Sequence, residues 1–197
     1  MSRVKKQTSA ADDEKLFLKF FDLIAKHGYA GASFPALARA LKMKLAVIAR
    51  NYAGKEALLA AFSRYLDVKV AEGMEAGAED SPLKEQLFDT FMRRFEAMQP
   101  FRKGICRLME DALRDPRLAL QLFCLLPSFG RSLGLMLEFS GFKADSPAAL
   151  PVFIALKLAY LTTLRAWKND ESVDLSATMA ALDRSLERAL KPGRVFP

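Results

Sequence analysis

The most informative part of the sequence is SFPALARALKMKLAVIARNYAGKEALL, residues 33–59. Apolar side chains recur in it at helical spacing, in two short groups that are followed by a third apolar run: Leu37, Ala38 and Leu41, and then Met43, Ile48 and Tyr52. This spacing predicts a short helix, a tight turn and a second helix that share one small core. The stretch is therefore a helix-turn-helix pattern.

Basic residues are concentrated in the same part of the chain. Residues 1–56 hold 11 Lys and Arg against 5 Asp and Glu, whereas the remainder holds 19 against 18, so that nearly all of the net charge of +7 lies near the N-terminus. Such an asymmetry indicates contact with a polyanion.

Two further elements resemble the DNA-binding region of TetR-type transcriptional regulators. His27-Gly28-Tyr29 is similar to the element where the first helix of that family ends. YAGKEAL, residues 52–58, resembles the Phe-x-x-Lys-Glu-x-Leu signature that follows the family's third helix. The resemblance covers about residues 12–62. It implies an all-α fold, with an N-terminal three-helix DNA-binding region followed by a larger helical domain for ligand binding and dimerisation.

The expected organisation has three parts: a basic flexible arm over residues 1–11, a helix-turn-helix DNA-binding domain over 12–54, and a ligand-binding and dimerisation domain over 55–197. Helical spacing continues to residue 190, without alternating strand patterns, and predicts about nine helices. One helix should run from Gly54 to about Ala78. Three Ser-Pro or Asp-Pro pairs should cap and open others: Ser81-Pro82, Asp115-Pro116 and Ser146-Pro147.

The second helix of the motif departs from the resembled family. Lys42 stands where the family usually has a turn Gly, and we expect it to take a left-handed conformation at a steric cost. Base readout would rest on Lys44, Arg50 and Asn51, supplemented by apolar contact with thymine methyl groups, while Lys44 and Lys55 contact phosphate. The candidate DNA-binding residues are Ser33, Lys44, Arg50, Asn51, Tyr52 and Lys55.

Aromatic and Met side chains in the middle of the chain have two interpretations. Their spacing fits an ordinary core. In TetR-type regulators the corresponding helices surround an effector pocket, so the resemblance implies a cavity for a small apolar effector. The candidate ligand-binding residues are Phe88, Met92, Phe95, Met109 and Phe123.

Nothing in the sequence indicates catalysis, a metal site or a cofactor. The chain has a single His, His27, and its paired carboxylates, Glu110-Asp111 and Asp170-Glu171, are interpreted as solvated charge. Metal-ligand spacing, a phosphate-binding loop and a nucleophile elbow are absent from the sequence. Cys106 and Cys124 are expected to be reduced, buried thiols of a cytoplasmic protein.

Residues 147–164 are the most apolar segment, but they contain Lys157 and fall short of the length of a membrane span. We expect no membrane insertion. A helix apolar on nearly all sides needs a second cover, and a partner subunit would provide it. The sequence therefore predicts a homodimer in which helices over residues 146–168 and 174–190 pair with their symmetry mates.

A second resemblance keeps another function open. A region of about 25 residues is similar to the C-terminal region of lipid-binding proteins of ubiquinone biosynthesis that share the TetR fold. The similarity rests on Trp167-Lys168-Asn169-Asp170-Glu171-Ser172, Thr178-Met179 and Leu182-Asp183-Arg184. This resemblance implies an isoprenoid-binding accessory protein that does not bind DNA. Structural roles could also explain the similarity, with Trp167 anchoring a helix end and Asp174 capping the next helix. The main hypothesis is a homodimeric, ligand-responsive repressor that binds a palindromic operator in double-stranded DNA.

Overall fold

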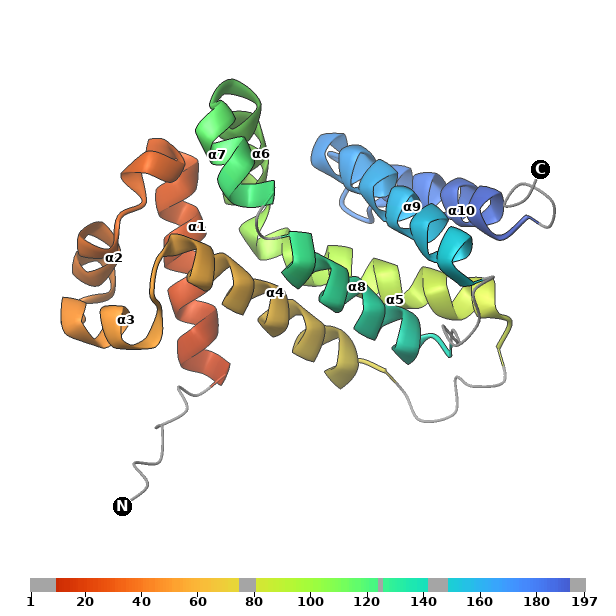
Figure 1. The fold of residues 1–197 in the computed structure, drawn as a ribbon, viewed down its shortest axis with the longest axis horizontal. Helices are drawn as coiled ribbons and strands as arrows, with labels where there is room; N and C mark the ends of the chain where they lie inside the picture. Colours follow the sequence, from red (N-terminus) through yellow and green to blue (C-terminus); the bar gives the residue numbers. More distant parts are fainter. Residues whose placement is uncertain (1–9, 75–80, 124–125, 142–148, 192–197) are drawn as a thin grey trace, which may run out of the picture. The chain divides into compact units, whose positions relative to one another are not determined.

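The computed structural model describes residues 10–74, 81–123, 126–141 and 149–191, although the side chains at 10, 11, 123, 126–129 and 149 are not described. These residues form ten α-helices and one short 3₁₀ helix, η2, and no strand, which confirms the all-α prediction (Figure 1). The elements are α1 (Ala10–Gly31), α2 (Phe34–Leu41), α3 (Leu45–Asn51), α4 (Lys55–Glu72), α5 (Leu83–Met98), η2 (Gln99–Phe101), α6 (Arg102–Arg114), α7 (Pro116–Phe123), α8 (Leu126–Phe139), α9 (Ala149–Asn169) and α10 (Ser176–Leu190).

The helix ends test the capping predictions. Asp115 caps α7 as expected, since its carboxylate accepts a hydrogen bond from the Arg117 N–H at 2.9 Å. The Ser81 cap was predicted wrongly, because Pro82 occupies the cap position of α5 and no side chain caps that helix. Helix α4 ends at Glu72 rather than near Ala78, because the Gly73 N–H turns back to the carbonyl three residues earlier. The Ser146-Pro147 pair lies outside the described residues.

Two compact units divide the chain: residues 1–65 with 100–126, and residues 66–99 with 127–197. We call them unit 1 and unit 2. The helix-turn-helix thus shares a unit with α6 and α7, which lie far from it in sequence. The two units are defined by packing and not by binding, so they do not test the functional boundary predicted at residue 54. That boundary stays a prediction. Helix α1 begins at Ala10, within the arm predicted over residues 1–11, of which residues 1–9 are outside the described part.

The core of unit 1 forms where α1 packs against α6 and α4. Phe17, Phe20, Phe21 and Ile24 are spaced along one face of α1 and are each 2% exposed or less. The Phe21 ring lies 4.5 Å from that of Phe62 on α4, centroid to centroid. This aromatic core holds α1 in place, and the helix-turn-helix follows the C-terminal end of that helix.

Glycine at position 104 lets α6 approach α1 closely. A Cβ atom placed on Gly104 would lie 2.3 Å from the backbone oxygen of Phe21, far inside contact distance. Gly28 kinks α1 in turn, with a φ of 71° that favours glycine. The kink matches the helix end expected at His27-Gly28-Tyr29.

Asp111 on α6 holds the kinked end of α1, so its interpretation as solvated charge was wrong. Its carboxylate accepts hydrogen bonds from the Tyr29 N–H at 2.8 Å and from Arg107 at 2.8 Å. Desolvation raises the pKa of Asp111, but these hydrogen bonds outweigh it and leave the pKa below its usual value. Tyr29 lies 82 residues away, so no local pattern indicates the contact.

Unit 2 is built around a buried aromatic group and a buried ion pair. Phe95 of α5 stacks on Tyr160 of α9, with ring centroids 5.1 Å apart. Arg94 is 3% exposed; it donates hydrogen bonds to Asp67 at 2.5 Å and to the Tyr160 hydroxyl at 3.2 Å. Ser132 of α8 also donates to Asp67. The network ties the second half of α4 to α5, α8 and α9.

Asp170 joins α9 to α10 and is the second carboxylate wrongly interpreted as solvated. It is 3% exposed and accepts hydrogen bonds from the Thr178 N–H at 2.7 Å and the Thr178 hydroxyl at 2.6 Å. Ser172 donates two more, from its N–H and its hydroxyl. The expectation of buried thiols also fails for Cys106, which is half-buried; Cys124 is outside the described residues.

Candidate nucleic-acid interface

The helix-turn-helix forms where the sequence predicts it (Figure 1). Ser33 caps α2, since its hydroxyl accepts a hydrogen bond from the Ala36 N–H at 3.3 Å. Pro35 fits the first turn of that helix, where its missing N–H is not needed. Lys42 has a φ of 53°, so the left-handed turn residue expected there is confirmed. Its N–H bonds to the end of α2 and closes the turn.

Helix α3 is held by one buried side chain. Ile48 is 1% exposed, and every other residue of Leu45–Asn51 is exposed. The predicted readout residues Lys44, Arg50 and Asn51 are among the exposed ones, at the start and the end of α3. Every residue of α3 except Ile48 is therefore exposed to solvent, as a helix that enters a groove requires.

The charged residues within the helix-turn-helix itself all have one sign. No acidic residue occurs between Asp22 and Glu56. The helix-turn-helix within that interval carries four exposed cations: Arg39, Lys42, Lys44 and Arg50. Since nothing of opposite charge lies among them in sequence, the motif forms a positive surface that complements the phosphates of a duplex.

Lys55 is engaged within unit 1. Its ammonium donates a hydrogen bond to the Tyr29 carbonyl at 2.6 Å and lies 3.9 Å from the centroid of the Tyr29 ring. Burial lowers the pKa of Lys55, and the charge of Glu56 acts in the opposite direction. Burial followed by the charge of Glu56 raises the pKa of Tyr29, whose hydroxyl donates to Glu56 at 3.3 Å. The Lys55 ammonium thus already contacts the carbonyl and the ring of Tyr29. Its contact with phosphate stays a prediction.

Tyr52 and Ser33 have structural surroundings that the sequence did not reveal. Tyr52 is half-buried; burial, then the charge of Asp13 on α1, raises its pKa, and Arg64 on α4 lowers it. Ser33 is half-buried, and its hydroxyl accepts the hydrogen bond that caps α2. Both side chains thus support the motif, and their predicted contact with DNA is untested.

Comparison with solved structures identifies the fold. A TetR transcriptional regulator from Nitrosomonas europaea ATCC 19718 superposes with a TM-score of 0.69 at 18% identity, over 90% of this chain and 97% of that one. The chain has the fold of a TetR transcriptional regulator. A transcriptional regulator from Rhodococcus sp. Rha1 superposes with a TM-score of 0.50 at 19% identity, over 93% of this chain and 96% of that one. No protein-family model and no curated protein sequence matches the chain.

The residues predicted to line an effector cavity are divided between the units of this TetR-type fold. Phe88, Met92 and Phe95 belong to unit 2, whereas Met109 and Phe123 belong to unit 1. Met92 and Phe95 are buried, 6% and 0% exposed, which agrees with their interpretation as core. Met109 is half-buried, and the side chain of Phe123 is not described. Neither unit brings all five together.

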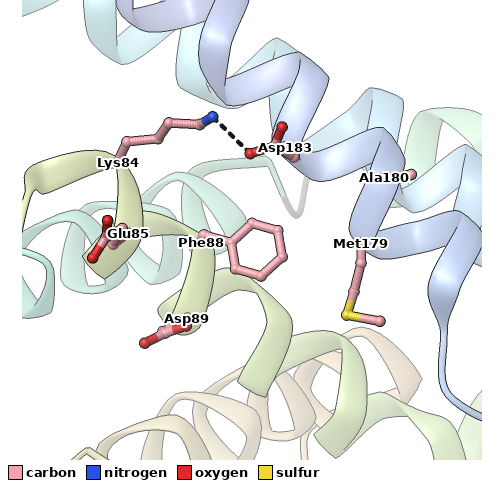
Figure 2. A pocket seen from close by; sticks show the side chains of 7 residues that line it. All are labelled: Lys84, Glu85, Phe88, Asp89, Met179, Ala180 and Asp183. Carbon is pink, nitrogen blue, oxygen red and sulfur yellow. Dashed lines mark ion pairs between the residues drawn. The ribbon is translucent and has the colours of Figure 1, made fainter.

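Among the members of that set whose side chains are described, Phe88 alone lines a hollow between α5 and α10, which has a volume of about 580 Å³. Figure 2 shows the Phe88 ring pointing from α5 toward Met179 of α10, with Lys84 paired to Asp183 at 2.6 Å above them. Glu85 and Asp89 complete the charged rim. This open, polar-rimmed hollow does not have the enclosed apolar walls expected for the predicted effector.

Helix α9 carries an exposed apolar stripe. Leu150, Ile154, Leu158 and Leu161 are 62%, 50%, 59% and 47% exposed and recur at the spacing of one helix face. By length and composition alone Leu150–Asn169 could cross a membrane, with a mean hydropathy of 1.2 and 28% of it buried. A core or interface helix of a soluble protein meets the same criterion, so this finding is weak evidence for insertion.

The segment that carried the second resemblance has structural roles here. Trp167 is fully buried in unit 2, with its ring 6.3 Å from that of Phe95. Asp170, Ser172 and Thr178 form the hydrogen-bonded connection between α9 and α10. Asp174 accepts from the Ser176 N–H at 3.2 Å, close to the predicted cap, although the cap position itself is Leu175.

Proposed function

We propose that the protein is a cytoplasmic DNA-binding transcriptional regulator that acts as a homodimer. The observation that carries the proposal is the exposed recognition helix α3, whose surroundings hold four exposed cations and, between Asp22 and Glu56, no acidic residue. Arg50 and Asn51 project hydrogen-bonding groups from α3, and Lys44 stands at its start. Phosphate contacts position such a helix, and its side chains select the base pairs.

A dimer gives this short helix useful specificity. One seven-residue helix contacts few bases, whereas two copies about 34 Å apart reach successive major grooves of a palindromic operator. We further propose a repressor controlled by a small apolar effector. Binding of that effector would favour a dimer with a different helix spacing, and DNA would be released because the two states bind the operator unequally.

Salt-dependent DNA binding tests the proposal. Fluorescence anisotropy with duplexes from beside the protein's own gene should give affinities that fall steeply with salt. Lys44→Ala should reduce the salt slope by about one, and Asn51→Ala should mainly relax sequence preference. Lys26→Ala is the matched control, because it also removes one charge but lies on α1, paired with Asp22 at 3.0 Å. No binding by the folded protein at low salt would refute the proposal.

The exposed stripe on α9 favours a second candidate, a lipid-binding accessory protein with the same fold. Four exposed Leu and Ile side chains on one helix face could cover the chain of an isoprenoid as well as a partner subunit. Native mass spectrometry of the purified protein distinguishes the candidates. An accessory protein should carry an isoprenoid, retain it in Arg50→Ala, and bind no duplex. A regulator should bind a duplex, and a lipid that acts as its effector should weaken that binding.

A further inference from the structure

The tip of the helix-turn-helix exposes apolar side chains among its cations. Met43, Leu45 and Val47 are 38%, 44% and 39% exposed. Lys42 and Lys44 alternate with them in sequence, and all of them lie in the turn or on α3. Exposed apolar groups within a binding surface require a partner that offers apolar surface in return. Phosphates and most base edges offer none.

The outward face of α3 can be derived from the position of Ile48. At about 100° per residue, Ala46 and Arg50 lie nearly opposite that buried side chain, and Val47 and Ala49 lie on either side of them. Three of these four residues are apolar, and two are Ala. Small side chains allow the helix backbone to approach the floor of a groove, so the contacts made there are short and mostly apolar.

We infer that α3 selects its operator mainly through the C5 methyl groups of thymine, contacted by Val47 and the exposed Ala residues of the outward face and by Leu45, which is exposed at the start of the helix. Thymine is the only base of normal DNA that presents an apolar group in the major groove. Arg50 and Asn51 supply the few hydrogen bonds to base edges. The inference rests on the proposed function. It specifies the DNA that the protein should prefer, namely half-sites in which thymine recurs at the base pairs that α3 contacts.

The cations around α3 favour DNA as the occupant of this surface. Arg39, Lys42, Lys44 and Arg50 are all exposed, and phosphates on both walls of a major groove would face such cations while the apolar centre meets the methyl groups. An anionic lipid surface would meet the same charge and apolar groups. Vesicles therefore belong in the test.

Deoxyuridine substitution tests the inference directly, because uracil differs from thymine only by the methyl group. A half-site sequence is first selected from a randomised duplex pool with the full-length protein, and its thymines are then replaced one at a time. Each lost methyl contact should weaken binding about fourfold, the equivalent of about 0.8 kcal/mol. Val47→Ser and Leu45→Ser should each bring the ratio of thymine to uracil affinity toward one at a subset of positions.

Val68→Ser is the matched control, since Val68 is 53% exposed on α4 and outside the helix-turn-helix. It should leave the ratio unchanged, and circular dichroism melting should show all variants folded. Binding to the selected duplex with equal affinity for thymine and uracil would overturn the inference and leave the proposed function intact. Absence of binding to any duplex, with binding to phosphatidylglycerol vesicles instead, would overturn both.

Discussion

Asp170 shows how one side chain can hold two helices together. Desolvation raises the pKa of its carboxyl group, but four hydrogen bonds from Ser172 and Thr178 outweigh that effect and hold the pKa at about 2. One of these bonds satisfies the Thr178 N–H in the first turn of α10, a helix that has no side-chain cap at Leu175. A carboxylate before the helix thus replaces the missing cap.

Removal of the Asp170 carboxylate should destabilise the protein. Asp170→Ala leaves the buried N–H and hydroxyl of Thr178 without an acceptor, so the free energy of unfolding in urea should fall by roughly 2 to 3 kcal/mol. Glu171→Ala, at the exposed neighbouring position, should change it by less than about 0.5 kcal/mol. Equal effects of the two substitutions would contradict the role assigned to Asp170.

Acid should remove the same stabilisation. The folded-state pKa of Asp170 lies below its ordinary value of 3.8, so its contribution is fully present above pH 3.8 and is lost as the pH falls toward 2. The difference in unfolding free energy between wild type and Asp170→Ala should therefore shrink across that window.

Local sequence patterns predicted the residues whose partners are close in sequence. Lys42 takes the left-handed turn conformation, and Asp115 caps the helix that begins one residue later. Asp111 and Asp170 were missed because adjacent acidic residues are usually solvated. Only tertiary packing places Tyr29 against Asp111, 82 residues away, and Thr178 against Asp170. The exposure of Lys44, Arg50 and Asn51 was predictable since short-range periodicity decides which residues of α3 face outward, whereas their contact with DNA stays a prediction.

At the scale of elements, the approach of α6 to α1 depends on one missing side chain. Gly104→Ala would place a Cβ atom 2.3 Å from the backbone oxygen of Phe21, and backbone cannot rotate away as a side chain can. Thermal or urea unfolding should show a loss of about 1 to 3 kcal/mol, the usual cost of overpacking a core.

Gly134→Ala provides the opposite control. Gly134 also lies within a helix, α8, but its added Cβ would meet no atom within 4 Å. Without a clash, the better helix propensity of Ala should stabilise the protein by about 0.5 to 1 kcal/mol. A stabilising effect of Gly104→Ala as well would disprove the close contact between α1 and α6.

At the scale of the whole molecule, the stripe on α9 is the surface on which the proposed homodimer depends. Leu161→Glu adds a charge to that exposed stripe, and taking an unpaired carboxylate out of water at an interface should yield monomers. Leu186 lies on α10, the second helix predicted to pair with its symmetry mate, but it is fully buried within its own subunit, so Leu186→Glu should unfold the chain instead. Sedimentation at micromolar concentration distinguishes these outcomes, and a monomeric wild type would exclude the dimer.

Hydroxyl-radical footprinting on the DNA beside the protein's own gene reports DNA binding, dimerisation and the spacing of the two α3 helices in one experiment. A dimer with one α3 in each of two successive major grooves should protect two symmetric half-sites whose centres are about 10 base pairs apart. Arg50→Ala, which removes the cation at the centre of the outward face, should weaken both half-sites equally. Folded protein that leaves every duplex unprotected at low salt would contradict the proposal that a dimer binds DNA through α3.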